Sequence, residues 1–187
     1  MRGRHRIERR SRIFLGCEGE SEQGYGAFLQ RLADAAALNV HIVIRNLQPA
    51  GDPLALAQKA VLSFNNEDRK AALIGKAIML DADRLSEPQD RGQRALELLA
   101  REQFTTIWQR PDHEGFLLRH FAGHEHDDPP RGRSMQALQA LWPGYHKNMA
   151  AADLQRVLTL EHVARAARVT AELMSLLQMI GLERGEP

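Results

Sequence analysis

Cysteine is nearly absent from this 187-residue chain, in which Cys17 is the only one. A single cysteine excludes an internal disulfide framework and indicates a reducing compartment, so we expect a cytoplasmic protein. Long hydrophobic runs are missing too: no apolar stretch approaches the ~20 residues needed to cross a bilayer. The run from Ile13 to Cys17 is also too short for the core of a signal peptide. The sequence therefore predicts a protein without a membrane partner.

Net charge is small as well, +1 at pH 7, but it is unevenly distributed. Arginine occupies six of the first twelve positions, and we treat residues 1–12 as a basic N-terminal arm. Arginine pairs bidentately with phosphate, so Arg4, Arg6, Arg9 and Arg10 are candidates for binding a nucleic-acid backbone. The alternative is that the run is a solvated tail.

The hydrophobic fraction of 43% and the chain length fit one folded domain with a real core. Apolar periodicity predicts strands at residues 12–17, 40–44, 76–80 and 104–108. It also predicts helices at residues 22–37, 87–102, 113–121 and 135–142, together with a helix that starts at residue 53. Residues 153–180 are predicted to form mainly one long helix. This alternating order predicts an α/β fold whose parallel-rich sheet carries helices on both faces. We assign residues 13–122 to the core and 123–187 to a polar loop and a C-terminal helical extension packed on it.

Two acidic clusters follow predicted strands. Glu18 and Glu22 come after the first strand, and Asp81 and Asp83 come after the third. The carboxyl ends of parallel strands meet at one edge of a sheet, where ligands bind. Carboxylates gathered there repel one another unless a cation or protons neutralise them, and oxygen ligands favour Mg²⁺ or Mn²⁺. The pattern therefore predicts a metal-dependent site for phosphate chemistry.

Each candidate residue also has a purely structural interpretation. Glu22 near a helix N-terminus favours the helix dipole, and Asp81 and Asp83 are typical of turns. His120 lies in an apolar predicted helix, which favours a hydrogen-bonded structural histidine, although it stays the best catalytic candidate among the histidines. Lys147 is either an ordinary surface lysine or a contact for a substrate phosphate.

Several short motifs follow one another along the chain. They are the arginine-rich start, Cys17-Glu18-Gly19-Glu20-Ser21-Glu22, Asp81-Ala82-Asp83, the stretch 110–121 with Pro111, Glu114, Leu117, Leu118, His120 and Phe121, and Tyr145-His146-Lys147. Together they resemble the RloB-like family of Toprim proteins, which is associated with restriction loci and abortive phage defence. The chain departs from the family pattern at residues 110–113, which read Arg-Pro-Asp-His in place of Asn-Pro-Cys-Phe, and at Phe116, where the family has Trp.

The resemblance implies a Toprim-like fold and assigns roles to the acidic residues. Glu18 would be a metal ligand or general acid/base, and Asp81 and Asp83 would hold metal. Glu22 and Glu114 would be further ligands. The implied catalytic set is Glu18, Asp81 and Asp83, with Mg²⁺ or Mn²⁺ as the cofactor.

We therefore expect a Mg²⁺-dependent nuclease that cleaves nucleic-acid phosphodiesters in a bacterial anti-phage system. One alternative is a non-catalytic nucleic-acid-binding or sensing subunit of a defence complex, and another is a small-molecule phosphohydrolase. The choice between DNA and RNA stays open, as do a partner protein from the same locus and a homodimer.

Overall fold

A parallel sheet of four strands forms the centre of the computed structural model, which describes residues 9–82 and 90–183. The strands are β1 (Ser11–Cys17), β2 (Val40–Asn46), β3 (Gly75–Asp81) and β4 (Thr105–Gln109), in the spatial order β2-β1-β3-β4. All three strand pairs are parallel. The predicted α/β fold with a parallel sheet flanked by helices is therefore confirmed.

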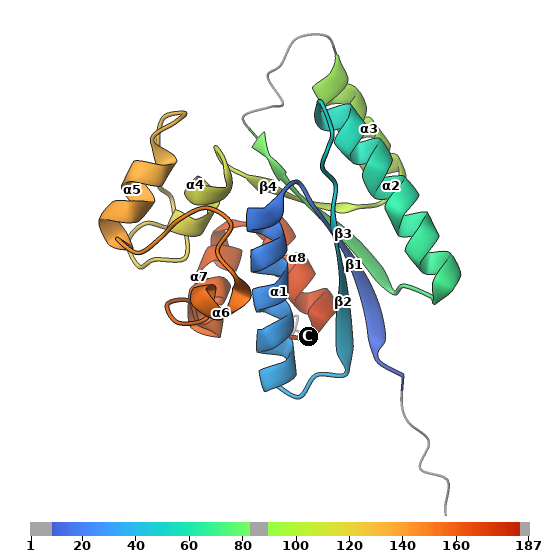
Figure 1. Cartoon of the computed structure of the whole chain (residues 1–187), viewed down its shortest axis with the longest axis horizontal. Coiled ribbons are helices and arrows are strands. Elements are labelled where there is room, and N and C mark those ends of the chain that lie inside the picture. The colour runs from blue at the N-terminus through green and yellow to red at the C-terminus, as the bar shows by residue number, and fades with distance from the viewer. Residues whose placement is uncertain (1–8, 83–89, 184–187) are drawn as a thin grey trace, which may run out of the picture.

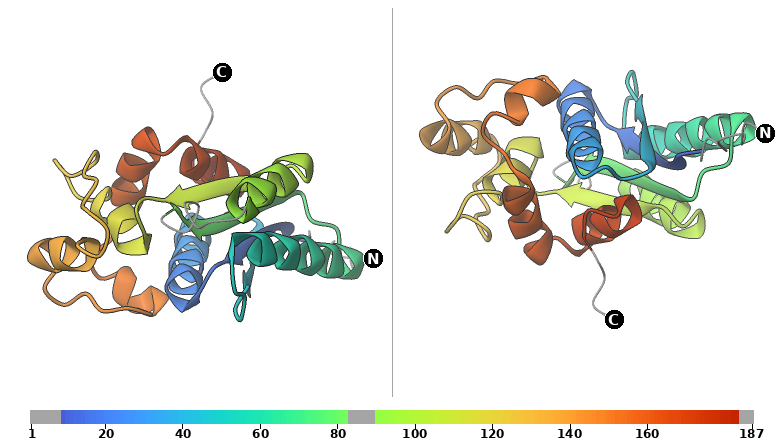
Figure 2. Two further views of the ribbon diagram at one scale, coloured as in Figure 1. Left: turned by 90° about the horizontal axis from the view of Figure 1, so that it is seen from above. Right: turned by 90° about the horizontal axis from the view of Figure 1, so that it is seen from below.

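Helices cover both faces of this sheet (Figure 1). They are α1 (Glu20–Ala35), α2 (Pro53–Lys70), α3 (Arg91–Arg101), α4 (His113–Leu118), α5 (Ser134–Leu141), α6 (Ala151–Leu154), α7 (Leu160–Val169) and α8 (Ala171–Ile180). The two further views show α2 and α3 on one side and α1 with the C-terminal helices on the other (Figure 2). Among the helices of the described ranges, none combines the length and apolar character needed to span a membrane.

The alternation of side chains along β1 explains why both faces are covered. Ile13 and Leu15 belong to the hydrophobic cluster shared with α1 and the C-terminal helices, whereas Phe14 belongs to the cluster shared with α2 and α3. All three residues are fully buried. Successive strand residues point to opposite faces, so a central strand buried on both sides must be apolar throughout.

The chain changes direction across the sheet between β1 and β3. From β1 it passes through α1 to β2 on one side, and from β2 it crosses back through α2 to β3 on the other side. The helices that follow β1 and β3 therefore leave toward opposite faces (Figure 1). In open α/β sheets this arrangement creates a crevice at the carboxyl ends of the two strands, which is the usual place for a ligand.

The prediction of one long helix over 153–180 is wrong. The structure has α6, α7 and α8 there, and Thr170 breaks the last two apart with an extended backbone (φ −132°, ψ 91°). Val163 of α7 and Leu173 of α8 are both fully buried in the same cluster. The break lets each short helix turn its apolar side to that cluster, because the packing outweighs helical periodicity.

Glu67 on α2 is a buried carboxylate with three cationic partners. It accepts hydrogen bonds from Arg12 at 3.3 Å, from Arg45 at 2.6 Å and from Lys70 at 2.7 Å. The bonds from Lys70 and Arg45 lower the pKa of Glu67 to about 2. The network ties β1 and β2 to the C-terminal half of α2.

We expect Glu67→Gln to lower the melting temperature at pH 7 and to weaken its dependence on pH in acid. The pKa of Glu67 in the folded state lies below its ordinary value of about 4.3. The charged group therefore stabilises the fold above that ordinary value, and this contribution is lost as the pH falls toward about 2. Thermal melting between pH 2 and 7 measures it, with the exposed Glu97→Gln as control. An acid-induced loss of stability equal to that of wild type would refute the assignment.

Candidate functional site

Glu18 and Asp81 meet at the crevice between β1 and β3. Glu18 directly follows β1, and Asp81 is the last residue of β3, the neighbouring strand. The backbone N–H of Asp81 donates to Glu18 Oε2 at 3.0 Å, and the Glu18 side chain is largely buried. The strand pairing therefore brings together two acids that are more than sixty positions apart in the sequence.

Glu22 reaches the same crevice from the first turn of α1. Its Oε2 accepts a hydrogen bond from the backbone N–H of Gly19 at 2.9 Å, which holds the carboxylate at the start of the helix. Glu22 is only 5% exposed, and this burial raises its pKa, while the nearby positive charge of Lys147 acts in the opposite direction. The crevice therefore resists holding several negative charges without compensation.

Gln109, the last residue of β4, connects two of these carboxylates. The hydrogen-bonding partners orient its fully buried amide so that the nitrogen donates to Glu22 Oε1 at 2.9 Å and to Asp81 Oδ1 at 3.1 Å. Its oxygen accepts from His113 Nδ1 at 2.6 Å. One neutral side chain thus supplies a donor to each acid and orients the histidine.

His113 stands next to Glu22 and is nearly as buried. Its Nδ1 lies 3.5 Å from Glu22 Oε1, and burial lowers the pKa of His113 to about 4. The ring is therefore neutral at pH 7. Because Nδ1 donates to Gln109, the lone pair of the neutral ring is on Nε2.

Glu114 enters the site from the N-terminus of α4. The side chain of Asp112 caps this helix by accepting from the Gly115 N–H at 2.9 Å. Glu114 Oε1 accepts from the hydroxyl of Tyr145 at 3.1 Å, and both side chains are buried. Burial and the neighbouring Glu114 raise the pKa of Tyr145, which therefore remains a hydrogen-bond donor at neutral pH.

The segment after Tyr145 closes the site from the C-terminal extension. Asn148 adopts a left-handed conformation (φ 60°), which asparagine tolerates better than most residues. Its backbone N–H donates to Ser21 Oγ at 3.1 Å, and that hydroxyl donates in turn to Asn148 Oδ1 at 3.1 Å. These bonds fasten the segment to the first turn of α1 and bring Lys147 to the rim of the crevice.

These elements enclose a polar hollow of about 200 Å³, which we call the acidic hollow; its lining includes Glu18, Glu22, Asp81, His113, Glu114 and Lys147. Carboxylate oxygens are the ligands that Mg²⁺ and Mn²⁺ prefer, so the donor set suits a hard divalent cation. In residues 9–82 and 90–183, however, no three side chains of His, Cys, Asp or Glu are grouped as metal ligands. The chemistry of the donors fits a cation, whereas their arrangement here is held by protein hydrogen bonds.

The acidic hollow contains most of the acids that the sequence singled out. Glu18, Glu22, Asp81 and Glu114 line it, and so does Lys147. Asp83 lies outside the described residues, as do Arg4 and Arg6. Sequence reasoning missed Gln109, whose only signal is a polar residue at the end of a predicted strand, and gave His113 no role in the site.

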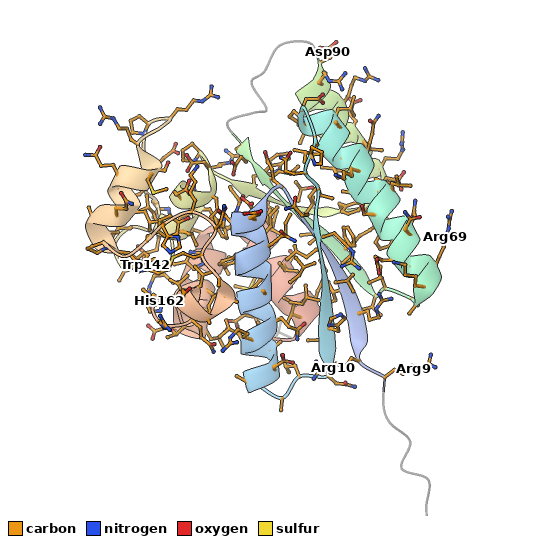
Figure 3. All side chains as sticks on the ribbon, viewed as in Figure 1. Arg9, Arg10, Arg69, Asp90, Trp142 and His162 are labelled. Atoms are coloured by element: carbon orange, nitrogen blue, oxygen red, sulfur yellow. The ribbon has the colours of Figure 1, made fainter. Side chains whose placement is uncertain are left out.

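Arg9 and Arg10 lie far from the acidic hollow. Figure 3 shows both at the end of the sheet where β1 begins, whereas Glu18 follows the other end of that strand. Arg10 forms an exposed ion pair with Asp34 at 3.1 Å. The described part of the basic arm therefore starts at the edge of the sheet opposite the site.

His120 and Cys17 are buried side chains whose contacts favour a structural role. His120 is fully buried, accepts from the Tyr25 hydroxyl at Nε2 (2.8 Å) and donates from Nδ1 to the carbonyl of Phe116 (3.3 Å). Burial lowers the pKa of His120 to about 3 and raises that of the Cys17 thiol, so both side chains stay neutral at pH 7. These surroundings favour a packing role for each of them.

Comparison of the chain with family models, with curated proteins and with solved structures returns no match.

We expect Gln109→Leu to lower the free energy of unfolding by about 1–3 kcal/mol, because Glu22, Asp81 and His113 lose a buried partner. Without divalent cations, Gln109→Glu should lower the free energy of unfolding more than Gln109→Leu does, since it adds a negative charge beside two carboxylates. Urea denaturation measures both variants against Gln93→Leu, which changes an exposed glutamine on α3. Wild-type stability in Gln109→Leu would show that the bridge does not hold the acids.

Proposed function

We propose that this chain is a Toprim-like protein related to the RloB-like family and that it cleaves nucleic-acid phosphodiesters with Mg²⁺ or Mn²⁺. The observation that carries the proposal is the meeting of Glu18 and Asp81 at the carboxyl ends of adjacent parallel strands. A glutamate after the first strand and an aspartate after a later one match the motifs of that family. The anti-phage setting rests on the resemblance alone.

Four side chains would hold the cation: Glu18, Glu22, Asp81 and Glu114. They line one hollow in which Lys147 is the only Lys or Arg among the described lining residues, so negative charge is in excess. A divalent cation, when bound, supplies positive charge opposite the negative charge that develops on a phosphodiester during cleavage. It would also relieve the repulsion that the acids otherwise exert on one another.

The surrounding residues of the chain would position the acids and the substrate. Gln109 holds Glu22 and Asp81 in fixed orientations and sets the tautomer of His113. Lys147, at the rim, would attract a substrate phosphate. Groups fixed in advance by hydrogen bonds need little rearrangement when charge develops, which is how enzyme sites lower barriers.

A non-catalytic binding subunit is the second candidate, and one observation favours it. The Gln109 amide already donates to Glu22 and Asp81, which partly satisfies these two acids without a cation. The loop from Arg110 to His113, where the chain departs from the family, directly follows this residue. Such a protein would retain the crevice for recognition and bind nucleic acid without cleaving it.

The nuclease proposal predicts metal-dependent cleavage that requires Glu18 and Asp81. We expect Glu18→Gln and Asp81→Asn each to reduce cleavage by at least about 100-fold, because each removes a charged oxygen ligand. The assay uses single- and double-stranded DNA and RNA with Mg²⁺ or Mn²⁺. Divalent cations should also raise the melting temperature of wild type more than that of Asp81→Asn, since binding to the folded state stabilises it.

The matched control is Glu97→Gln, which neutralises an exposed acid on α3 and should leave cleavage and the metal effect unchanged. An inert wild type whose melting ignores both metals would overturn the nuclease proposal and favour the binding subunit. Equal cleavage by wild type and Asp81→Asn would place the activity elsewhere.

The basic arm should contribute salt-dependent affinity for nucleic acid. Deleting residues 1–8 should weaken binding and reduce the slope of log affinity against log salt by about 0.9 for each duplex phosphate that the shortened arm no longer neutralises. The deletion stops before β1, which begins at Ser11, so thermal melting should not change. Affinity and salt slope equal to those of the full chain would identify the arm as a solubilising tail.

A further inference from the structure

Among the described residues that line the acidic hollow, His113 is the only histidine. It is the first residue of α4, and only 4% of it is exposed. The chain departs from the family motif at this position, so the resemblance assigns this side chain no role. Two of the proposed cation ligands are its neighbours: Glu22 faces it from α1, and Glu114 follows it in the sequence.

Contacts on several sides hold the His113 ring in place. The amide oxygen of Gln109 accepts a hydrogen bond from Nδ1 at 2.6 Å. The ring stands nearly perpendicular to that of Tyr25, with centroids 6.3 Å apart, and lies tilted against the ring of Phe116 at 6.2 Å. A ring that is fixed by packing and by one hydrogen bond presents its other nitrogen in a set direction.

The other ring nitrogen, Nε2, has no hydrogen-bond partner in the part of the chain that the structure describes. It carries the lone pair, because Nδ1 donates to Gln109. Across residues 9–82 and 90–183, four buried polar atoms are closed to solvent and lack a partner, and Nε2 is not one of them. Since His113 lines the acidic hollow and its Nδ1 is already bonded, Nε2 is the polar atom that it offers to the hollow.

The charge around this lone pair favours a cation over a neutral hydrogen-bond donor. The described lining has one ammonium group, from Lys147, and five carboxylates, from Glu18, Glu20, Glu22, Asp81 and Glu114. A neutral donor would satisfy the lone pair alone, whereas a divalent cation would also offset the charge of the acids. Histidines that bind a metal through one nitrogen usually donate from the other to an oxygen, as His113 does to Gln109.

We propose that His113 Nε2 is a nitrogen ligand for the cation of the acidic hollow and makes the hollow prefer Mn²⁺ to Mg²⁺. The inference rests on the cation site of the proposed function, and it adds the group that selects between the two ions. Mg²⁺ is bound mainly through oxygen, whereas imidazole nitrogen is a better ligand for first-row transition ions. Because no three possible ligands in residues 9–82 and 90–183 are already grouped, these side chains must move together when the ion binds.

Pulsed electron paramagnetic resonance of Mn²⁺ bound to the untagged full chain, in a buffer without nitrogen, tests the inference directly. The spectrum of wild type should show coupling to a nitrogen nucleus. His113→Asn should abolish the coupling, because the new amide can replace Nδ1 as the donor to Gln109 but leaves no atom at the position of Nε2. His146→Asn, which removes an exposed histidine outside the acidic hollow, should retain it.

Isothermal titration calorimetry with Mn²⁺ and with Mg²⁺ measures the selectivity. We expect His113→Asn to weaken Mn²⁺ binding by about tenfold or more and Mg²⁺ binding by much less, since the ligand that is lost is a nitrogen. His113→Gln can bring an amide oxygen near the position of Nε2, so it should bind Mn²⁺ more tightly than His113→Asn but with less preference over Mg²⁺ than wild type. Thermal melting without metal identifies which variants fold, and His113→Gln replaces His113→Asn in both measurements if the latter does not.

The inference is overturned if wild type binds Mn²⁺ without nitrogen coupling, if the coupling survives in a folded His113 variant, or if that variant loses affinity for both ions equally. It is also overturned if wild type binds no Mn²⁺ at millimolar concentration. Cleavage assays decide the proposed function separately. Nitrogen-coordinated Mn²⁺ in a chain that cleaves no nucleic acid would support this inference and contradict the nuclease proposal, whereas cleavage with Mn²⁺ bound through oxygen alone would do the reverse.

Discussion

Repulsion among buried carboxylates is the constraint on which the arrangement around the acidic hollow depends. Each acid is matched to a particular donor: the Asp81 N–H for Glu18, the Gly19 N–H for Glu22 and the Tyr145 hydroxyl for Glu114. These donors come from β3, from the turn before α1 and from the C-terminal extension. The extension is therefore part of the site, because without it Glu114 would be left buried without this partner.

The same constraint explains why β4 ends in glutamine. A carboxylate at position 109 would add charge next to Glu22 and Asp81, and an apolar residue would leave both of them with fewer donors. An amide supplies two donors and one acceptor, which matches two carboxylates and one histidine N–H. Gln109 is neutral, yet its two amide N–H donors compensate the charges of Glu22 and Asp81.

Local patterns in the sequence were sufficient to predict the sheet and the meeting of Glu18 with Asp81. Both depend on apolar strands that end in acids, and parallel strands bring such ends together whatever the loops do. The roles of Gln109 and Tyr145 could not be predicted in this way, because their partners come from distant segments. The break at Thr170 was missed for a similar reason: the α7 and α8 sequences are each helical, and only packing separates them.

The length of β1 sets the distance between Arg9 and Arg10, which precede this strand, and the acidic hollow at its other end. This strand has seven residues, so it separates the start of the basic arm from the acidic hollow by about 23 Å. Duplex DNA advances about 3.4 Å per base pair, so about seven base pairs cover that span. If the protein binds nucleic acid as proposed, a duplex shorter than this can contact Arg9 and Arg10 or the acidic hollow, but not both at once. Under that proposal, the length of one strand would set the shortest duplex that binds at both places.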